Sequence, residues 1–143
     1  MGLLDKLFGR KKPDYPALED RSEAAEQLKR VESELQTFIE GISEDIEIVP
    51  APDETYVFYG RPPNAFGVAW VREGEVKDLR KVVEERGLAP HRAQVVGEQL
   101  RVAYELSGGD DRYSMKLAGR TVVVTPSDGL RRKVHDIVEK LAA

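Results

Sequence analysis

Apolar side chains between positions 20 and 40 recur at steps of three and four residues, and most positions between them are polar or charged. This spacing places the apolar residues on one face of a helix. They are Leu28, Val31, Leu35, Phe38 and Ile39. Asp20 and Glu23 have the spacing of a capping box, and Gly41 followed by Ile42 is typical of a Schellman end. We therefore predict a single helix over this range.

The period of the pattern changes to two after this helix, which is typical of strands. Ile46 and Ile48 alternate with acidic residues, and two segments rich in β-branched and aromatic residues follow, Thr55–Tyr59 and Ala65–Arg72. Prolines occupy the segments between these runs, and proline has no N–H group to donate to a neighbouring strand. We predict three strands joined by loops.

A second helix is predicted over Glu75–Arg86, followed by a glycine stop at Gly87. Its apolar face would consist of Val76, Leu79, Val82 and Val83. The next segment, residues 91–106, fits two patterns at once. Its apolar residues fit a helix at Ala93, Val96, Leu100 and Ala103, and a strand at Leu100, Val102, Tyr104 and Leu106. We expect a helix to about Gly97 and then a strand.

The last third of the chain predicts a hairpin and a final helix. Apolar Tyr113, Met115 and Leu117 alternate with polar residues, and Ala118-Gly119 reverses the chain into a second strand, Thr121–Val124. The segment Thr125-Pro126-Ser127-Asp128 offers a cap, a proline at the first helical position and an acid at the third. The helix after it has an apolar stripe of Leu130, Val134, Ile137, Val138 and Leu141.

The order of elements is helix, three strands, helix, two or three strands, helix. It predicts an α+β fold, with an antiparallel sheet of five or six strands and three main helices. We expect residues 18–143 to form one domain, preceded by an amphipathic segment and linker over residues 1–17. By element order alone, this arrangement is similar to the small acidic dimeric chaperones of type III secretion, which implies self-association.

Composition narrows the function classes. The chain of 143 residues suits one domain, and it has no cysteine, so disulfides, thiolate metal sites and thiol nucleophiles are excluded. A net charge of −4 disfavours binding to a phosphate backbone, so nucleic acid is not expected as a partner. No apolar run approaches the roughly 20 residues that span a bilayer, and charges interrupt the N-terminus before a signal sequence can form. We expect a cytoplasmic protein.

The sequence offers little catalytic chemistry. It has no phosphate-binding glycine loop, no Gly-x-Ser-x-Gly and no His-Glu-x-x-His. His91 and His135 are expected to be solvent-exposed, the acidic pair Asp110-Asp111 belongs to a polar turn, and the basic run at 131–133 is a solvated helix face. We therefore predict no catalytic residue, no metal ligand and no cofactor.

Both faces of the predicted sheet are apolar, which is unusual for an antiparallel sheet with one solvated face. Either helices of the chain cover both faces, or one face binds a partner or a second copy. The partner-binding residues would then be Tyr59, Arg61, Pro62, Pro63, Ala65, Gly67 and Ala69. The leading functional hypothesis is a chaperone-like binding or adaptor module, expected as a homodimer, without catalysis.

The first twelve residues support an alternative function. An amphipathic stretch of apolar residues is followed there by a basic run, a composition typical of a short interfacial segment, which binds a membrane surface weakly. The residues are Leu3, Leu4, Leu7, Phe8, Arg10, Lys11 and Lys12. The alternative to the adaptor hypothesis is therefore a peripheral regulatory protein at the membrane surface; a disordered tail, or a helix docked on its own domain, also fits this segment.

Overall fold

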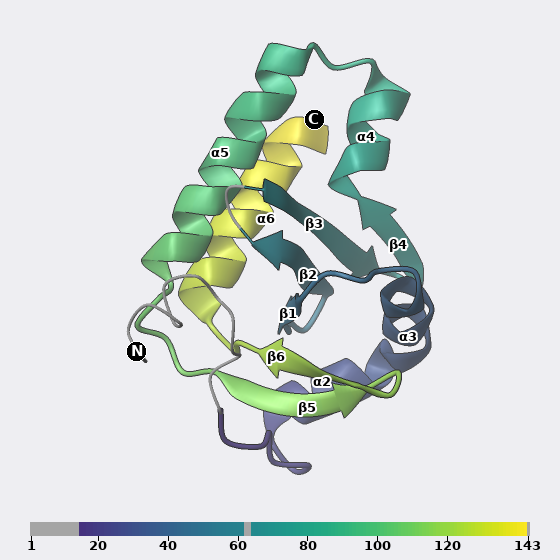
Figure 1. Ribbon diagram of the computed structural model, residues 1–143, viewed down its shortest axis with the longest axis vertical. Coiled ribbons are helices and arrows are strands. Elements are labelled where there is room, and N and C mark those ends of the chain that lie inside the picture. The colour runs from purple at the N-terminus through teal and green to yellow at the C-terminus, as the bar shows by residue number, and fades with distance from the viewer. Residues whose placement is uncertain (1–14, 62–63, 143) are drawn as a thin grey trace.

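The computed structural model describes residues 15–61 and 64–142 and has an α+β fold, as predicted (Figure 1). Its helices are α2 (Glu23–Arg30), α3 (Glu32–Glu40), α4 (Leu79–Arg86), α5 (Pro90–Leu106) and α6 (Asp128–Ala142). Its strands are β1 (Ile46–Val49), β2 (Glu54–Arg61), β3 (Asn64–Arg72), β4 (Glu75–Asp78), β5 (Tyr113–Leu117) and β6 (Arg120–Val124). No helix in these ranges is long and apolar enough to span a membrane.

The six strands form one sheet in the order β4-β3-β2-β1-β6-β5. Neighbours in this sheet are antiparallel except β1 and β6, which are parallel. The sheet is therefore mixed, and mostly antiparallel as predicted. The parallel pair arises because β6 returns to the sheet beside the first strand, after two intervening helices.

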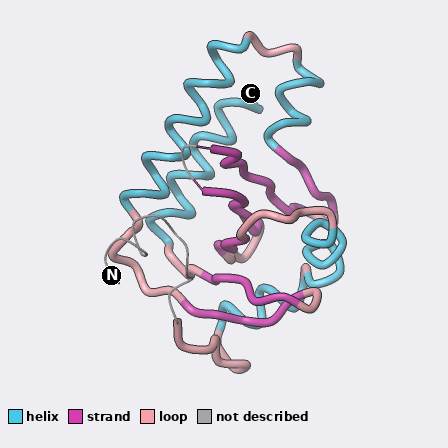
Figure 2. The backbone as a smooth tube through the Cα atoms, in the orientation of Figure 1, coloured by secondary structure: helices cyan, strands magenta, loops and turns pink. Residues whose placement is uncertain are grey.

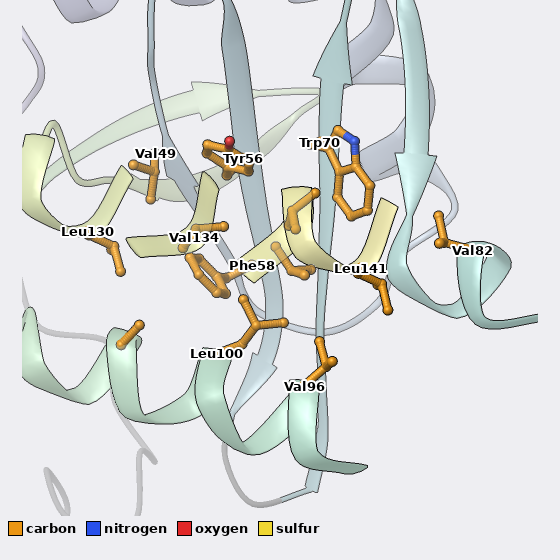
Figure 3. Close-up of a cluster of buried hydrophobic side chains, with 13 residues drawn as sticks. Val49, Tyr56, Phe58, Trp70, Val82, Val96, Leu100, Leu130, Val134 and Leu141 are labelled. Carbon is orange, nitrogen blue, oxygen red and sulfur yellow. The ribbon is translucent and has the colours of Figure 1, made fainter. Parts of the chain in front are cut away.

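Helices cover both faces of the sheet (Figure 2). On one face, helices α4, α5 and α6 pack over Tyr56, Phe58 and Trp70, and Figure 3 shows Val96, Leu100 and Val134 around these rings. On the other face, α2 and α3 pack over the second set of strand residues. That set is Ile46, Ile48, Val57, Tyr59, Ala69, Val71, Val122 and Val124. The apolar residues on both faces thus belong to two cores, one on each face of the sheet.

The predicted first helix is two helices. The break lies at Val31, whose φ of −118° and ψ of 17° are not helical, and α2 begins after Ser22, whose hydroxyl accepts a hydrogen bond from the Ala25 N–H. The capping box at Asp20 was therefore wrong by two residues. Gly41 ends α3 with a φ of −88°, so the predicted Schellman end, which needs a left-handed residue, is also wrong there.

The segment after Trp70 differs most from the prediction. Residues Glu75–Asp78 pair with β3 as strand β4, so only the second part of the predicted helix is helical. Asp78 caps that helix by accepting a hydrogen bond from the Arg80 N–H at 3.1 Å. Residues 90–106 are helical throughout as α5, because Val96 and Leu100 bury against the core at helical spacing, and the expected strand after Gly97 is wrong.

Several local predictions are confirmed. The hairpin β5–β6 turns at Ala118 and Gly119, both with positive φ, as a tight hairpin turn requires. Gly87 is left-handed, with a φ of 59°, and ends α4 in a Schellman arrangement, in which the Leu88 N–H donates to the Val83 carbonyl.

The last helix starts later than expected, because its cap is the Ser127 hydroxyl, which accepts a hydrogen bond from the Leu130 N–H.

Candidate functional site

A polar cavity of about 180 Å³ lies where the start of β2 meets α6. We call it the His135 pocket; it is lined by Ala51, Asp53, Glu54, Tyr56, Arg72, Arg131 and His135. Glu54 and Tyr56 are two residues apart on a strand, so both side chains point to the face that α6 covers. Val134 and Val138 anchor α6 in the core, which leaves His135 on the flank of the helix, above the start of β2.

Three polar groups meet at the floor of this pocket. The Glu54 carboxylate is 5% exposed, and the Tyr56 hydroxyl donates a hydrogen bond to its Oε1. His135 Nδ1 lies 3.3 Å from the same oxygen and 3.2 Å from the Tyr56 hydroxyl. The His135 side chain is 43% exposed, so the imidazole connects the buried carboxylate to the solvent.

The Tyr56 hydroxyl is a permanent donor in this arrangement. Burial, followed by the hydrogen bond to Glu54 and the charge of that carboxylate, raises the pKa of Tyr56 far above its ordinary value of 10. The phenol therefore stays protonated over the whole physiological range. Its single proton points at Glu54 and fixes the position of that carboxylate.

Arg72 closes the other side of the pocket. It stands opposite Glu54 in the β2–β3 register, with its Nε 2.9 Å from Glu54 Oε2 and its Nη2 3.2 Å from Glu139 Oε1. One guanidinium thus bridges two carboxylates. Nevertheless, Glu54 Oε2 accepts no hydrogen bond from any residue in the described ranges, because the Arg72 N–H does not point at it.

Glu139 extends the cluster by one helical turn. It follows His135 by four residues on α6, so both side chains project from the same face of the helix. Glu54, His135 and Glu139 each have a potential ligand atom at this place, and these three atoms lie within 4.8 Å of one another. In the part of the chain that the structure describes, no other group of His, Asp and Glu side chains meets this criterion.

A second buried polar cluster is fully paired and has a structural role. The Glu47 carboxylate accepts hydrogen bonds from Tyr104, Arg112 and Thr125 at distances of 2.7 to 3.1 Å. Arg112 also donates to the carbonyl and the hydroxyl of Ser107. These bonds tie β1 to the end of α5 and to the segments on either side of the β5–β6 hairpin.

The structure places the described residues of the predicted partner surface together in the sheet, on the face that α2 and α3 cover. Tyr59 and Ala69 are buried beneath α3, and the Tyr59 ring packs edge-on against Phe38 at 5.9 Å between centroids. The expectation that they lie on an open sheet face is therefore wrong. Gly67 lies under the Tyr59 ring.

The remaining residues of both predicted surfaces are not described at the level of side chains. Arg61 and Ala65 belong to β2 and β3, but their side chains fall outside the described set, as do Pro62 and Pro63 entirely. The predicted membrane-surface residues also lie outside the described residues. They are Leu3, Leu4, Leu7, Phe8, Arg10, Lys11 and Lys12.

From the sequence, His135 is expected to be a solvated side chain, and neither Glu54 nor Glu139 is a predicted site residue. A local signal was present, since His135-x-x-x-Glu139 is the spacing that puts two ligands on one face of a helix. His91, by contrast, is exposed near the start of α5, as expected. Asp110 accepts a hydrogen bond from the Ser127 hydroxyl at 2.6 Å, which links the turn before β5 to the start of α6.

A comparison of the chain with protein-family models, with curated proteins and with solved structures found no match.

Proposed function

We propose that the protein is a binding module and that its ligand site is the His135 pocket. The observation that carries this proposal is the Glu54 carboxylate: it is buried at the floor of a cavity, and its Oε2 accepts no hydrogen bond from a described residue. A buried acceptor of this kind costs about 1–3 kcal/mol, more for a charged group, unless something pairs with it. Arg72 Nε lies 2.9 Å from this oxygen without donating a hydrogen bond to it, so a small cation, or a ligand with its own hydrogen-bond donor, would supply that partner.

The exposure of the rim supports the same role. The side chains of Arg72 and His135 are 50% and 43% exposed, so both can move without disturbing the core. Glu54 and Tyr56, in contrast, are held in the sheet. A rigid acceptor beneath a mobile rim suits reversible binding of a small ion.

The test is a thermal unfolding screen of the untagged full chain with four probes: Zn²⁺, Mn²⁺, phosphate and citrate. A probe at about 100 times its Kd should stabilise the protein by about 2.7 kcal/mol, which raises Tm by several degrees. The shift should disappear in His135→Ala and persist in His91→Ala, the matched control with the only other histidine. The absence of a shift with every probe, or an equal shift in His135→Ala, would reject this function.

The adaptor role expected from the sequence is a second candidate, on a different surface. Three large apolar side chains of α5 are exposed, Val95, Val102 and Leu106, and their spacing aligns them along one stripe of the helix. We propose this stripe, in place of the covered sheet face, as the contact for a protein partner, with a second copy of the chain as the first partner to test.

Sedimentation at micromolar concentration tests this second candidate. If the stripe mediates a homodimer, Val102→Glu should shift the protein to a monomer. Gln94→Glu adds the same charge to an exposed position of α5 away from the stripe and should leave the dimer intact. A wild-type chain that is monomeric under these conditions would rule out self-association.

A further inference from the structure

We propose that the ligand of the His135 pocket is a divalent transition-metal ion of the Zn²⁺ type, bound by Glu54, His135 and Glu139. This inference rests on the binding function proposed for the same pocket and names its ligand. Zn²⁺ accepts both imidazole nitrogen and carboxylate oxygen as ligands, whereas Mg²⁺ and Ca²⁺ prefer oxygen ligands alone.

The distances between the donors are close to those that the ion requires. With bonds of about 2.0–2.2 Å, ligand atoms at the corners of a tetrahedron lie about 3.4 Å apart. His135 Nδ1 and Glu54 Oε1 are already 3.3 Å apart, and the three donor atoms lie within 4.8 Å of one another. A rotation of the exposed Glu139 side chain, which is 44% exposed, is enough to close the remaining gap.

The supporting contacts position the ligands before the ion binds. Glu54 is fixed on β2 by the Tyr56 hydroxyl, and His135 and Glu139 project from consecutive turns of a helix whose other face is buried. Hydrogen bonds to ligating carboxylates typically change metal affinity by about 10–100-fold. Three protein donors leave a fourth position of the tetrahedron for water.

Arg72 has a specific role in this proposal. Its guanidinium lies between Glu54 and Glu139, where it supplies one positive charge to two carboxylates. A divalent ion supplies two charges at the same place, and the half-exposed Arg72 side chain can move out into the solvent. Arg72 is therefore a competitor of the metal, and its removal should increase metal affinity.

The competing interpretation is an anion held by Arg72, Arg131 and His135. Glu54 and Glu139 already face Arg72, and Asp53 lines the same cavity. These three carboxylates outnumber the two guanidinium groups of Arg72 and Arg131, so the charges favour a cation over an anion. Substitution of Arg72 should increase the affinity of a metal site, whereas it should decrease the affinity of an anion site. That opposition makes the proposal directly testable.

The experiment is isothermal titration of the untagged, chelator-treated full chain with Zn²⁺, repeated with inorganic phosphate. We expect one Zn²⁺ per chain, a loss of at least about tenfold in affinity in His135→Gln and Glu139→Gln, and no change in His91→Gln. Arg72→Gln should bind Zn²⁺ about tenfold more tightly, because it removes a competing charge within a few ångströms. Arg72, His135 and Glu139 are all partly exposed, so circular dichroism should show the wild-type fold for each variant.

Cobalt provides a readout that does not depend on affinity. Co²⁺ bound to the pocket should give the intense d–d absorption of a tetrahedral site with nitrogen and oxygen ligands, and His135→Gln should abolish it. The weak absorption of octahedral Co²⁺ would overturn the proposed geometry.

The outcomes separate this inference from the proposed function. Phosphate binding that is lost in His135→Ala, without Zn²⁺ binding, would overturn the metal assignment and keep the binding function. Zn²⁺ binding that is unaffected by His135→Gln and Glu139→Gln would place the ion elsewhere and reject the inference. Weaker Zn²⁺ binding in Arg72→Gln would reject the role of Arg72 as a competitor. Binding of neither Zn²⁺ nor phosphate would reject the metal assignment, and the proposed binding function would then depend on the Mn²⁺ and citrate results of the unfolding screen.

Discussion

The ring of Tyr59 lies directly over Gly67 on the neighbouring strand. The two residues are opposite each other in the β2–β3 register, and a Cβ atom added at Gly67 would lie 2.4 Å from Tyr59 Cζ. Because the ring fills the space where a side chain would stand, the hydroxyl can reach Asp78 and donate a hydrogen bond at 2.8 Å. A tyrosine of the same chain thus covers the face of β3 that carries Gly67.

The first prediction concerns this contact. Gly67→Ala should destabilise the protein by about 1–3 kcal/mol, since the ring and the backbone must shift to admit a methyl group. Gly97 is the matched control: it lies within α5, and an added Cβ meets nothing within 4 Å. Gly97→Ala should instead stabilise the protein by about 0.5–1 kcal/mol, through the higher helix propensity of alanine. Urea unfolding measures both effects, and equal changes in the two variants would contradict this account.

The second prediction concerns the buried ion pair between Arg112 and Glu47, whose side chains are 8% and 11% exposed. Arg112→Met should cost about 3–5 kcal/mol, because it leaves the Glu47 charge buried without a counter-ion. Adding Glu47→Gln should restore part of the loss, since the amide keeps hydrogen-bond capacity towards Tyr104 and Thr125 without a charge. Urea unfolding of the single and double variants measures the coupling, and a double variant less stable than Arg112→Met would contradict it.

The third prediction is a loss of stability at alkaline pH. Burial, followed by hydrogen bonds to Glu54 and Asp78 respectively, raises the pKa of Tyr56 and of Tyr59 above the ordinary value of 10. Their contribution is complete below pH 10 and declines above it, because only the unfolded chain then releases these protons. Each tyrosine adds a slope of up to about 1.4 kcal/mol per pH unit.

Urea midpoints between about pH 9 and about pH 11.5 measure this decline. Tyr59→Phe is the control, since phenylalanine keeps the ring and has no proton to lose; its stability should fall less steeply than that of the wild type. A variant with the same slope as the wild type would exclude Tyr59 as a source of the effect.

The fourth prediction tests the membrane-surface alternative, which rests on the sequence of the first twelve residues. The full chain should co-sediment weakly with vesicles of anionic lipid and less with neutral ones, because the basic run adds an electrostatic attraction of about 1 kcal/mol per residue. Replacing Arg10, Lys11 and Lys12 by Glu should abolish binding. Replacing the basic run at 131–133 in the same way provides the control, and equal losses in both variants would point to net charge alone.

Local signals predicted the elements whose structure is set by neighbouring residues. The turn at Ala118-Gly119 and the left-handed Gly87 are examples, since both depend on the conformations that a few residues can adopt. Strand β4 could not be predicted in this way. Residues Glu75–Asp78 form a strand because they pair with the edge of β3. Their local sequence is also compatible with a helix.

Local sequence signals are even less able to predict the candidate site. Glu54 and His135 are 81 positions apart, and they meet only because α6 crosses the start of β2. The pair on α6, His135 and Glu139, could be found from its spacing, but such pairs are common on solvated helices. What distinguishes this pair is the buried carboxylate beneath it, which only the fold reveals.

The parallel pairing of β1 with β6 has a consequence for how the chain folds. Glu47 and Thr125 are 78 positions apart, yet their side chains are hydrogen bonded across this seam. The β2–β3–β4 meander and the β5–β6 hairpin can each form from nearby residues, whereas joining them requires closure of a long loop, which is slow. Until the C-terminal part of the chain leaves the ribosome, one edge of β1 therefore stays unpaired. An unpaired apolar edge of this kind favours aggregation of the nascent protein.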